Sequence, residues 1–263
     1  MRKYLFVLKA TLIESLQYVL NILLGFITFF MILFVFMNLW EYIYSDTTKL
    51  INGYSKEQMI WYVILTEMIW FSMRNATLSF QISNDIKSGS IAYGMNKPYH
   101  YIAYIIAKHL GEIAVKSLMF MTAGLVIGYC FLGSFPVIRL YQLPSIILSL
   151  ILGMFVNTFL KMSISVLSFW IEDATPFHWI YDKMIIVLGI MFPVEVFPLW
   201  AQPIIRFTPI FVVTYGPAKL IIDYSSGMAL QVLVSQLIYF VISLSILLFI
   251  YQRGVKKLNV NGG

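Results

Sequence analysis

The residues that could do chemistry are ionisable side chains set within long apolar stretches. Glu67 and Arg74 lie seven residues apart in one such stretch, so a helix would place them on one face. Lys161 lies well inside another. Because a charge in hydrocarbon is costly, we expect all three to face the interior of a helix bundle or a wet cavity. Arg74 has an alternative, which is to extend its long side chain toward the cytoplasm.

A second charged pattern is a ladder of alternating sign. Lys108, Glu112 and Lys116 follow one another at intervals of four residues. This spacing predicts opposite charges paired along one stripe of a helix. The structural interpretation is a helix that projects from the membrane, with the ladder among the lipid headgroups. The alternative is that the ladder faces a substrate path.

Enzymatic and metal chemistry have little support. The three histidines are His100, His109 and His178. None has an acid or a nucleophile in a recognised arrangement. A metal site around His178, Asp173 and Asp182 has no defensible ligand spacing, so we expect no metal and a solvated loop over 171–183. The phosphate-loop pattern G-x-x-x-x-G-K-[ST] is also missing, so we expect no ATP site and no enzyme activity in this chain.

The elements that position these residues follow from composition. Of 263 residues, 60% are hydrophobic and 11% are charged, and the mean hydropathy is +0.83. A soluble domain carries roughly 25% charged residues. The apolar runs reach the ~20 residues that a membrane helix needs. The sequence therefore predicts an all-α, multi-pass membrane protein. The net charge of +6 is dispersed, which argues against a nucleic-acid partner, and the single Cys130 excludes an internal disulfide framework.

Six membrane spans are predicted within one domain, 1–263. They cover approximately 16–40, 57–82, 101–132, 145–170, 184–196 and 229–251. Residues 1–14 carry apolar and basic sides, which predicts a helix lying on the membrane surface; the alternative is the start of the first span. Gly124 and Gly128 form a small-xxx-small pair that predicts close helix packing.

The region between the last two spans is rich in proline. The prolines are Pro193, Pro198, Pro203, Pro209 and Pro217, and Glu195 lies among them. A continuous helix would not tolerate this density of proline. Broken helices at membrane depth occur only where protein or a cavity surrounds them. We therefore expect a short fifth span followed by an external re-entrant segment over 197–226.

Charge bias predicts the orientation. Nine Lys and Arg residues fall on one side of the predicted spans and five on the other. The excess marks the cytoplasmic side. Both termini and loops 83–100 and 171–183 are therefore expected in the cytoplasm, with 45–56 and 193–226 outside.

The loop I-S-N-D-I-K-S-G-S-I-A-Y-G-M-N-K-P-Y over 82–99 is the most distinctive connection. It combines charges, small residues and signals for a short capped helix between two spans. Such an element is suited to docking a soluble partner. The alternative is a plain connector at the lipid headgroups.

At this point the sequence resembles a known family. The string N-D-I-K-S-G-S-I-A-Y-G-M-N-K-P resembles the first cytoplasmic loop of ABC-2 type transporter permeases, in particular the small six-span prokaryotic branch. The strings G-Y-S-K-E-Q-M-I-W-Y, F-P-V-E-V-F-P-L-W, F-T-P-I-F and R-G-V-K-K-L-N-V-N-G-G are similar in order and spacing. The resemblance covers nearly the whole chain.

The resemblance implies the permease of an ATP-driven exporter in a bacterial cytoplasmic membrane. Such permeases work as dimers, with a copy or a related chain, and with two separate cytoplasmic ATPase subunits that bind ATP and Mg²⁺; this chain would hold no cofactor. The implied ATPase-docking residues are Asp85, Lys87, Gly89, Lys97 and Pro98, with Asp173 and Pro176 in the second cytoplasmic loop. Pro193, Glu195 and Pro198 would begin the external re-entrant segment.

Two other functions remain open. An ion-coupled transporter or channel would be supported by inverted repeats with paired broken helices, but a break is evident only in the C-terminal half. A membrane-embedded enzyme would need a catalytic constellation that the sequence lacks. A P-loop ATPase gene in the neighbouring coding region would favour the exporter.

Overall fold

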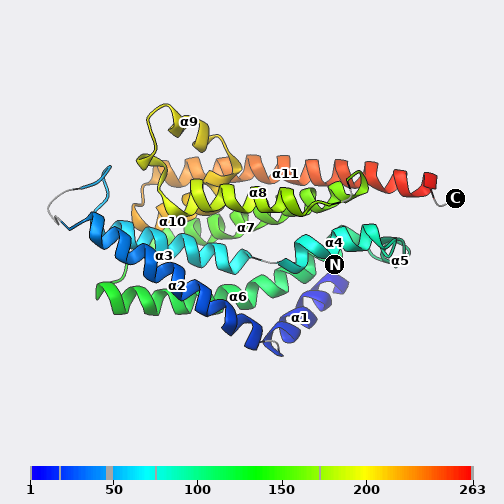
Figure 1. The fold of residues 1–263 in the computed structure, drawn as a ribbon, viewed down its shortest axis with the longest axis horizontal. Coiled ribbons are helices and arrows are strands. Elements are labelled where there is room, and N and C mark those ends of the chain that lie inside the picture. The colour runs from blue at the N-terminus through cyan, green and yellow to red at the C-terminus, as the bar shows by residue number, and fades with distance from the viewer. Residues whose placement is uncertain (1, 18, 46–49, 75, 172, 262–263) are drawn as a thin grey trace.

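The computed structural model describes residues 2–17, 19–45, 50–74, 76–171 and 173–261 (Figure 1). These residues form helices and connecting loops. In the described ranges the only β-type pairing is an isolated bridge between Ile51 and Tyr54. The prediction of an all-α chain is confirmed.

The eleven α-helices of the described residues run mainly along one long axis (Figure 1). They are α1 (Arg2–Gln17), α2 (Val19–Ile43), α3 (Lys56–Met73), α4 (Ala76–Lys87), α5 (Ile91–Met95), α6 (Tyr101–Leu132), α7 (Leu143–Val166), α8 (Thr175–Ile185), α9 (Ala201–Arg206), α10 (Gly216–Ile222) and α11 (Ser226–Asn261). Two π-helical segments, η3 (Ile186–Met191) and η5 (Phe211–Tyr215), and three short 3₁₀ turns, η1 (Leu140–Gln142), η2 (Leu167–Phe169) and η4 (Val194–Val196), complete the order.

The two ends of the bundle carry different elements (Figure 1). We call one the α5 end, where α5 lies with the start of α1 and the end of α11. We call the other the α9 end, where α9 lies with the loop that follows α2. Both described chain ends thus lie toward the α5 end.

Among the described residues, four helical stretches are long and apolar enough to cross a membrane. They are Leu23–Ile43, Tyr101–Leu132, Leu140–Phe169 and Ser226–Lys257. They match the first, third, fourth and sixth predicted spans. The helices in the second and fifth positions are shorter or carry more charge.

Helix α3 is the centre of the bundle. Every residue from Met59 to Met73 is buried, because α2, α6, α7 and α10 surround the helix. A helix that is apolar all round requires such cover. Close approach to α6 depends on glycine: a Cβ at Gly124 would lie 2.3 Å from Met68, and one at Gly128 would lie 2.4 Å from Trp61. The predicted close packing at these glycines is confirmed.

The predicted second span, 57–82, is not one continuous helix. Helix α3 ends at Met73, Arg74 is extended with ψ of 113°, and α4 begins at Ala76. The change of direction lets Ile82 and Ile86 join a second apolar cluster with α7, separate from the cluster around α3. The break exposes the carbonyl of Arg74, and Lys116 Nζ donates to it at 3.1 Å.

The expected loop over 171–183 is also wrong. Helix α8 begins at Thr175, with Pro176 in its first turn, where a missing N–H costs nothing. It continues through η3 to Met191, so this helix starts nine residues before the predicted boundary at 184. His178 is buried, and its Nε2 lies 3.0 Å from Ser165 Oγ, so it is not part of a solvated loop.

The N-terminal residues form a helix of their own. Helices α1 and α2 run in different directions (Figure 1), which excludes the interpretation of 1–14 as the start of the first span. Helix α1 packs against α6, where a Cβ at Gly111 would lie 2.7 Å from the carbonyl oxygen of Leu8. Leu5 and Phe6 remain exposed, as expected of a helix with one apolar side toward a membrane.

Candidate functional site

The predicted docking loop forms a compact helical hairpin at the α5 end. Helix α4 ends at Lys87, and the chain turns at Gly89 with φ of +73° before α5 begins at Ile91. Glycine adopts this conformation without strain, and among the other residues asparagine tolerates it best. A Cβ at Gly89 would meet nothing within 4 Å, so this turn faces outward.

Asp85 stabilises this hairpin from inside the chain. Its carboxylate accepts hydrogen bonds from Tyr101 Oη at 2.6 Å and from Ser90 Oγ at 3.1 Å. These bonds join α4 to the start of α6 and to the turn before α5. Asp85 therefore shapes the surface, whereas the resemblance implied a residue that contacts the ATPase.

The structure brings together the two segments that the resemblance assigned to docking. Lys87 Nζ lies 3.7 Å from Asp173 Oδ1, and both side chains are exposed. Asp173 Oδ1 also accepts the backbone N–H of Thr175 at 3.0 Å, at the start of α8. Hydrogen bonds from the Thr175 hydroxyl and N–H hold the pKa of the Asp173 carboxyl below its usual value, and nearby Lys87 adds to this effect.

Helix α1 holds the other side of the hairpin. The Lys3 ammonium donates to the carbonyl of Pro98, and the backbone N–H of His100 donates to Tyr4 Oη at 3.0 Å. Lys97 Nζ lies 5.9 Å from the centre of the Tyr99 ring. The hairpin is thus fixed against α1, α6 and the start of α8.

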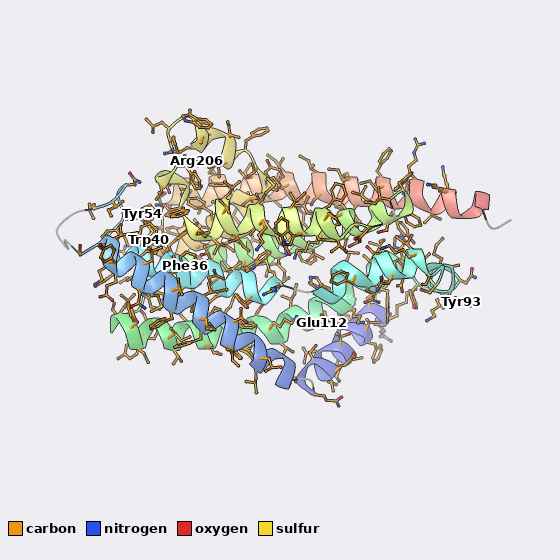
Figure 2. The ribbon with its side chains drawn as sticks, viewed as in Figure 1. Phe36, Trp40, Tyr54, Tyr93, Glu112 and Arg206 are labelled. Atoms are coloured by element: carbon orange, nitrogen blue, oxygen red, sulfur yellow. The ribbon has the colours of Figure 1, made fainter. Side chains whose placement is uncertain are left out.

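Sequence reasoning missed the most exposed aromatic residue of this surface. Tyr93 lies on α5, its side chain is 78% exposed, and it projects at the tip of the α5 end (Figure 2). The signal in the sequence was a single aromatic residue among small and polar ones. A rigid, exposed tyrosine on a fixed helix is a typical anchor for a protein interface.

The ionisable residues predicted within the bundle gather near the break after α3. Lys161 is 2% exposed and forms an ion pair with Asp182 of α8 at 2.9 Å. Its Nζ lies 5.0 Å from the Trp70 ring. Glu67 is 3% exposed, whereas Arg74 is exposed. Asp182 was missed because the sequence placed it in a loop.

The ladder on α6 faces protein. Lys108 Nζ donates to Gln81 Oε1 of α4 at 3.3 Å, and Lys116 caps the broken end of α3. Glu112 lies between them on α6 (Figure 2). The contacts of the two lysines place this part of α6 against α4 and the end of α3.

A cleft of about 360 Å³ lies beside this charged region. Helix α3 contributes one wall, α2 a second, and α8 with η3 a third. The polar residues that line it are Glu67, Arg74, Asp182 and Lys183, and its aromatic residues are Phe36, Trp70, Phe71 and Trp179. Such a mixture of charges and rings suits a ligand with a charged head and an apolar body.

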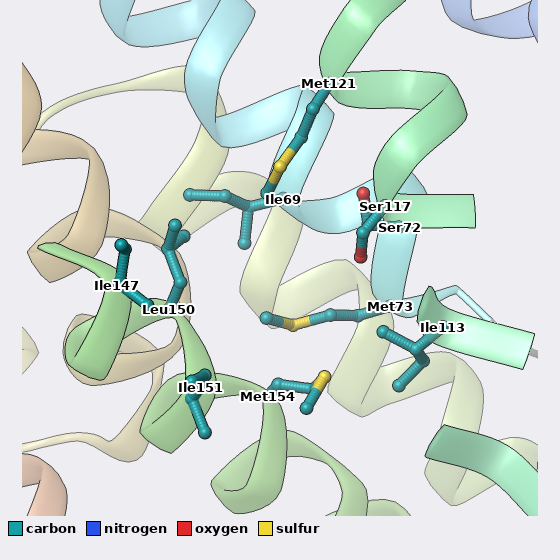
Figure 3. Close-up of a pocket in the computed structure, with 10 residues that line it drawn as sticks. All are labelled: Ile69, Ser72, Met73, Ile113, Ser117, Met121, Ile147, Leu150, Ile151 and Met154. Atoms are coloured by element: carbon teal, nitrogen blue, oxygen red, sulfur yellow. The ribbon is translucent and has the colours of Figure 1, made fainter. Parts of the chain in front are cut away.

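A second cavity lacks this chemistry. It has a volume of about 220 Å³ and lies between α3, α6 and α7, lined mostly by aliphatic and methionine side chains such as Met73, Met121 and Met154 (Figure 3). Its polar atoms are the hydroxyls of Ser72 and Ser117, and Ser72 already donates to the carbonyl of Met68 at 2.6 Å. This cavity offers apolar packing space and no charge to select a ligand.

At the α9 end, Glu195 is the centre of a polar network. Tyr54 Oη donates to Glu195 Oε2 at 2.9 Å, Tyr215 Oη donates to Oε1, and Arg206 lies 3.5 Å from Oε1. Lys219 Nζ in turn donates to Tyr54 Oη at 2.8 Å. Pro193 and Pro198 flank the short turn that carries Glu195. The network joins the loop after α2 to η4, α9, η5 and α10.

The comparison with protein families decides what kind of chain carries these features. The profile described as ABC-2 family transporter protein matches residues 26–262. The chain belongs to this family. A comparison with curated proteins gives no match. As an ABC-2 family member the protein is a multi-pass membrane component of a transport system, and the resemblance inferred from its loops is confirmed.

Proposed function

We propose that this ABC-2 protein is the membrane-spanning permease of an ATP-driven exporter in a bacterial cytoplasmic membrane. The four long apolar helices supply four spans. Helices α3 and α4 together form the second, and α8 with η3 forms the fifth. The segment with η4, α9, η5 and α10 is the external re-entrant part, and the α5 end with both termini faces the cytoplasm.

The proposed docking surface for a separate ATPase is the hairpin of α4 and α5. The observation that carries this proposal is an exposed tyrosine on a short helix that the chain holds rigidly on three sides. A coupling element must transmit force, so it needs firm contacts to the spanning helices as well as an exposed face. The contacts of Asp85 and Lys87 join the hairpin to neighbouring elements, and Tyr93 provides the exposed face.

In this proposal the permease acts as a dimer, with a copy of itself or a related chain. The ATPase subunits bind ATP and Mg²⁺ and hydrolyse the nucleotide. The chain itself contributes the transport path and the docking surface. No nucleic acid takes part.

The first test compares two equally exposed tyrosines. Tyr93→Ala should leave the permease folded and in the membrane but reduce co-purification of a P-loop ATPase encoded in the neighbouring coding region. Tyr42→Ala is the matched control, since Tyr42 is 80% exposed at the α9 end. Equal co-purification with both variants would mean that the hairpin is a connector at the headgroups.

Gly89 allows a second test that separates shape from bulk. Gly89→Asn keeps a residue that tolerates positive φ, whereas Gly89→Trp adds bulk and strain at an outward-facing turn. We expect Gly89→Asn to retain the ATPase and Gly89→Trp to release it. Retention by both variants would place Gly89 outside the interface.

A further inference from the structure

The cleft between α2, α3 and α8 contains a carboxyl group whose chemistry the fold leaves incomplete. The side chain of Glu67 is only 3% exposed. Its Oε2 has no hydrogen-bond partner within the described part of the chain. Burying such an oxygen without a donor destabilises the fold. Because Glu67 lines the cleft, a ligand there could supply the missing donor.

Two cations line the same cleft from other positions. Arg74 lies 5.9 Å from the Phe71 ring, and Lys183 lies 5.5 Å from the Trp179 ring. In the described part of the chain no ion pair within 4 Å joins Arg74 to Glu67, although the two charges are near enough to interact. Lys161 differs, because Asp182 already balances it.

The charged and the apolar residues of the cleft occupy different parts of its lining. Glu67 lies within α3, whereas Arg74 follows its last residue, Met73, and both line the cleft. Arg74 lies at the broken end of α3, nearest the α5 end. Ile32, Phe36 and Ile186 form apolar walls from α2 and η3. An occupant therefore meets an acceptor beside Glu67, donors toward the α5 end, and apolar surface alongside.

We infer that this cleft binds an amphiphile with a zwitterionic head, which is the substrate class if the proposed export function holds. Its ammonium group binds Glu67, its acidic group binds Arg74 and Lys183, and its chain lies against Ile32, Phe36 and Ile186. A ligand with only a negative charge would leave Glu67 without a partner. A ligand with only a positive charge would leave Arg74 and Lys183 without one.

The test uses three dodecyl probes that carry the same photoactivatable chain. Their heads are ammonio-propanesulfonate, ammonium and sulfate, so both cationic heads carry N–H donors for Glu67. The full-length permease is purified in a neutral maltoside without ATPase or ATP, and cross-linked peptides covering 32–36 and 179–186 are quantified. We expect the zwitterionic probe to label these peptides about tenfold more than either singly charged probe, the ratio for one further charged contact of about 1.4 kcal/mol.

Variants then assign each charge. Glu67→Gln should reduce labelling by the zwitterionic probe to the level of the sulfate probe. The double variant Arg74→Gln, Lys183→Gln should reduce it to the level of the ammonium probe. Glu14→Gln, an exposed carboxylate on α1, should change nothing.

The head-group preference of the wild-type permease decides the inference even if a variant does not fold. Equal labelling by the three probes overturns it. Absence of labelling in the cleft also overturns it, and would mean that a second copy of the chain covers this face. Because the assay contains no ATPase, these results are independent of the co-purification tests, which decide the proposed export function.

Discussion

Two glutamates of this permease lie in polar surroundings of opposite kinds. Glu195 at the α9 end accepts hydrogen bonds from Tyr54 and Tyr215 and lies beside Arg206. Glu67 in the cleft has a buried oxygen with no partner in the described residues, although Arg74 lines the same cleft. A carboxylate whose bonds are complete holds structure together, whereas one with a bond left to make is available to a ligand.

The same contrast divides the cations. Lys161 and Lys219 each have a carboxylate at 2.9 Å, in Asp182 and Asp223 respectively. Arg74 and Lys183 contact rings instead. We therefore expect substitutions of charges that already have a partner to lower stability. Substitutions of Glu67, Arg74 or Lys183, whose charges have no ion-pair partner in the described residues, should instead reduce ligand binding.

The largest expected effect is at the Lys161–Asp182 pair. Asp182→Asn leaves the buried Lys161 ammonium without its counter-charge, which should lower the free energy of unfolding by about 3 kcal/mol. Thermal unfolding in maltoside micelles measures this change. Lys183→Gln, at the exposed neighbouring position, is the control and should unfold like the wild type. An unchanged unfolding midpoint for Asp182→Asn would mean that the Lys161–Asp182 ion pair does not stabilise the fold.

A smaller loss is expected at Glu195. Glu195→Gln keeps one oxygen acceptor but loses the charge that two tyrosine hydroxyls contact, which should cost about 2 kcal/mol. Arg206→Gln should cost less than about 1 kcal/mol, because the Arg206–Glu195 pair is partly exposed. If the two variants shift the unfolding midpoint equally, the ion pair, and not the tyrosines, holds the network together.

Unlike Glu195→Gln, Glu67→Gln should reduce ligand binding without lowering stability. An amide is cheaper to bury than a carboxylate without a donor, so the free energy of unfolding should stay the same or rise by about 1 kcal/mol. Binding of the zwitterionic probe should fall. A destabilised Glu67→Gln would mean that Glu67 has a structural role like that of Glu195, and the contrast would fail.

The smallest effect is at Asp173, an exposed carboxylate with partners. Its lowered folded-state pKa means that its contribution to stability is present above the usual carboxyl pKa of about 3.9 and is lost as pH falls through the lowered value. The first turn of α8 should therefore loosen only in acid. Hydrogen exchange at 177–179, corrected for intrinsic rates, measures this change. In Asp173→Asn the exchange should no longer depend on this titration; a wild-type profile in that variant would assign the effect elsewhere.

Much of the α5 end could be predicted from the sequence. Capping residues, small residues and charges between two apolar runs mark a short helical loop, and local signals of this kind act over a few residues. The role of Asp85 could not be predicted, because its main partner, Tyr101, lies sixteen residues away on another helix. The break after Met73 also carries no proline or glycine, so no local signal announced it.

The sequence by itself determined the class of protein, its helical architecture, four of its long apolar helices and which charges must avoid lipid. These properties follow from composition and periodicity, which each segment carries alone. The tertiary structure decided which charges meet. Periodicity predicted one helix face for Glu67 and Arg74, but it could not show that α3 ends before Arg74 or that α2 and α8 pack beside them. Asp182 pairs with Lys161, and Glu67 keeps an unpartnered oxygen, because the packing of separate helices sets those distances.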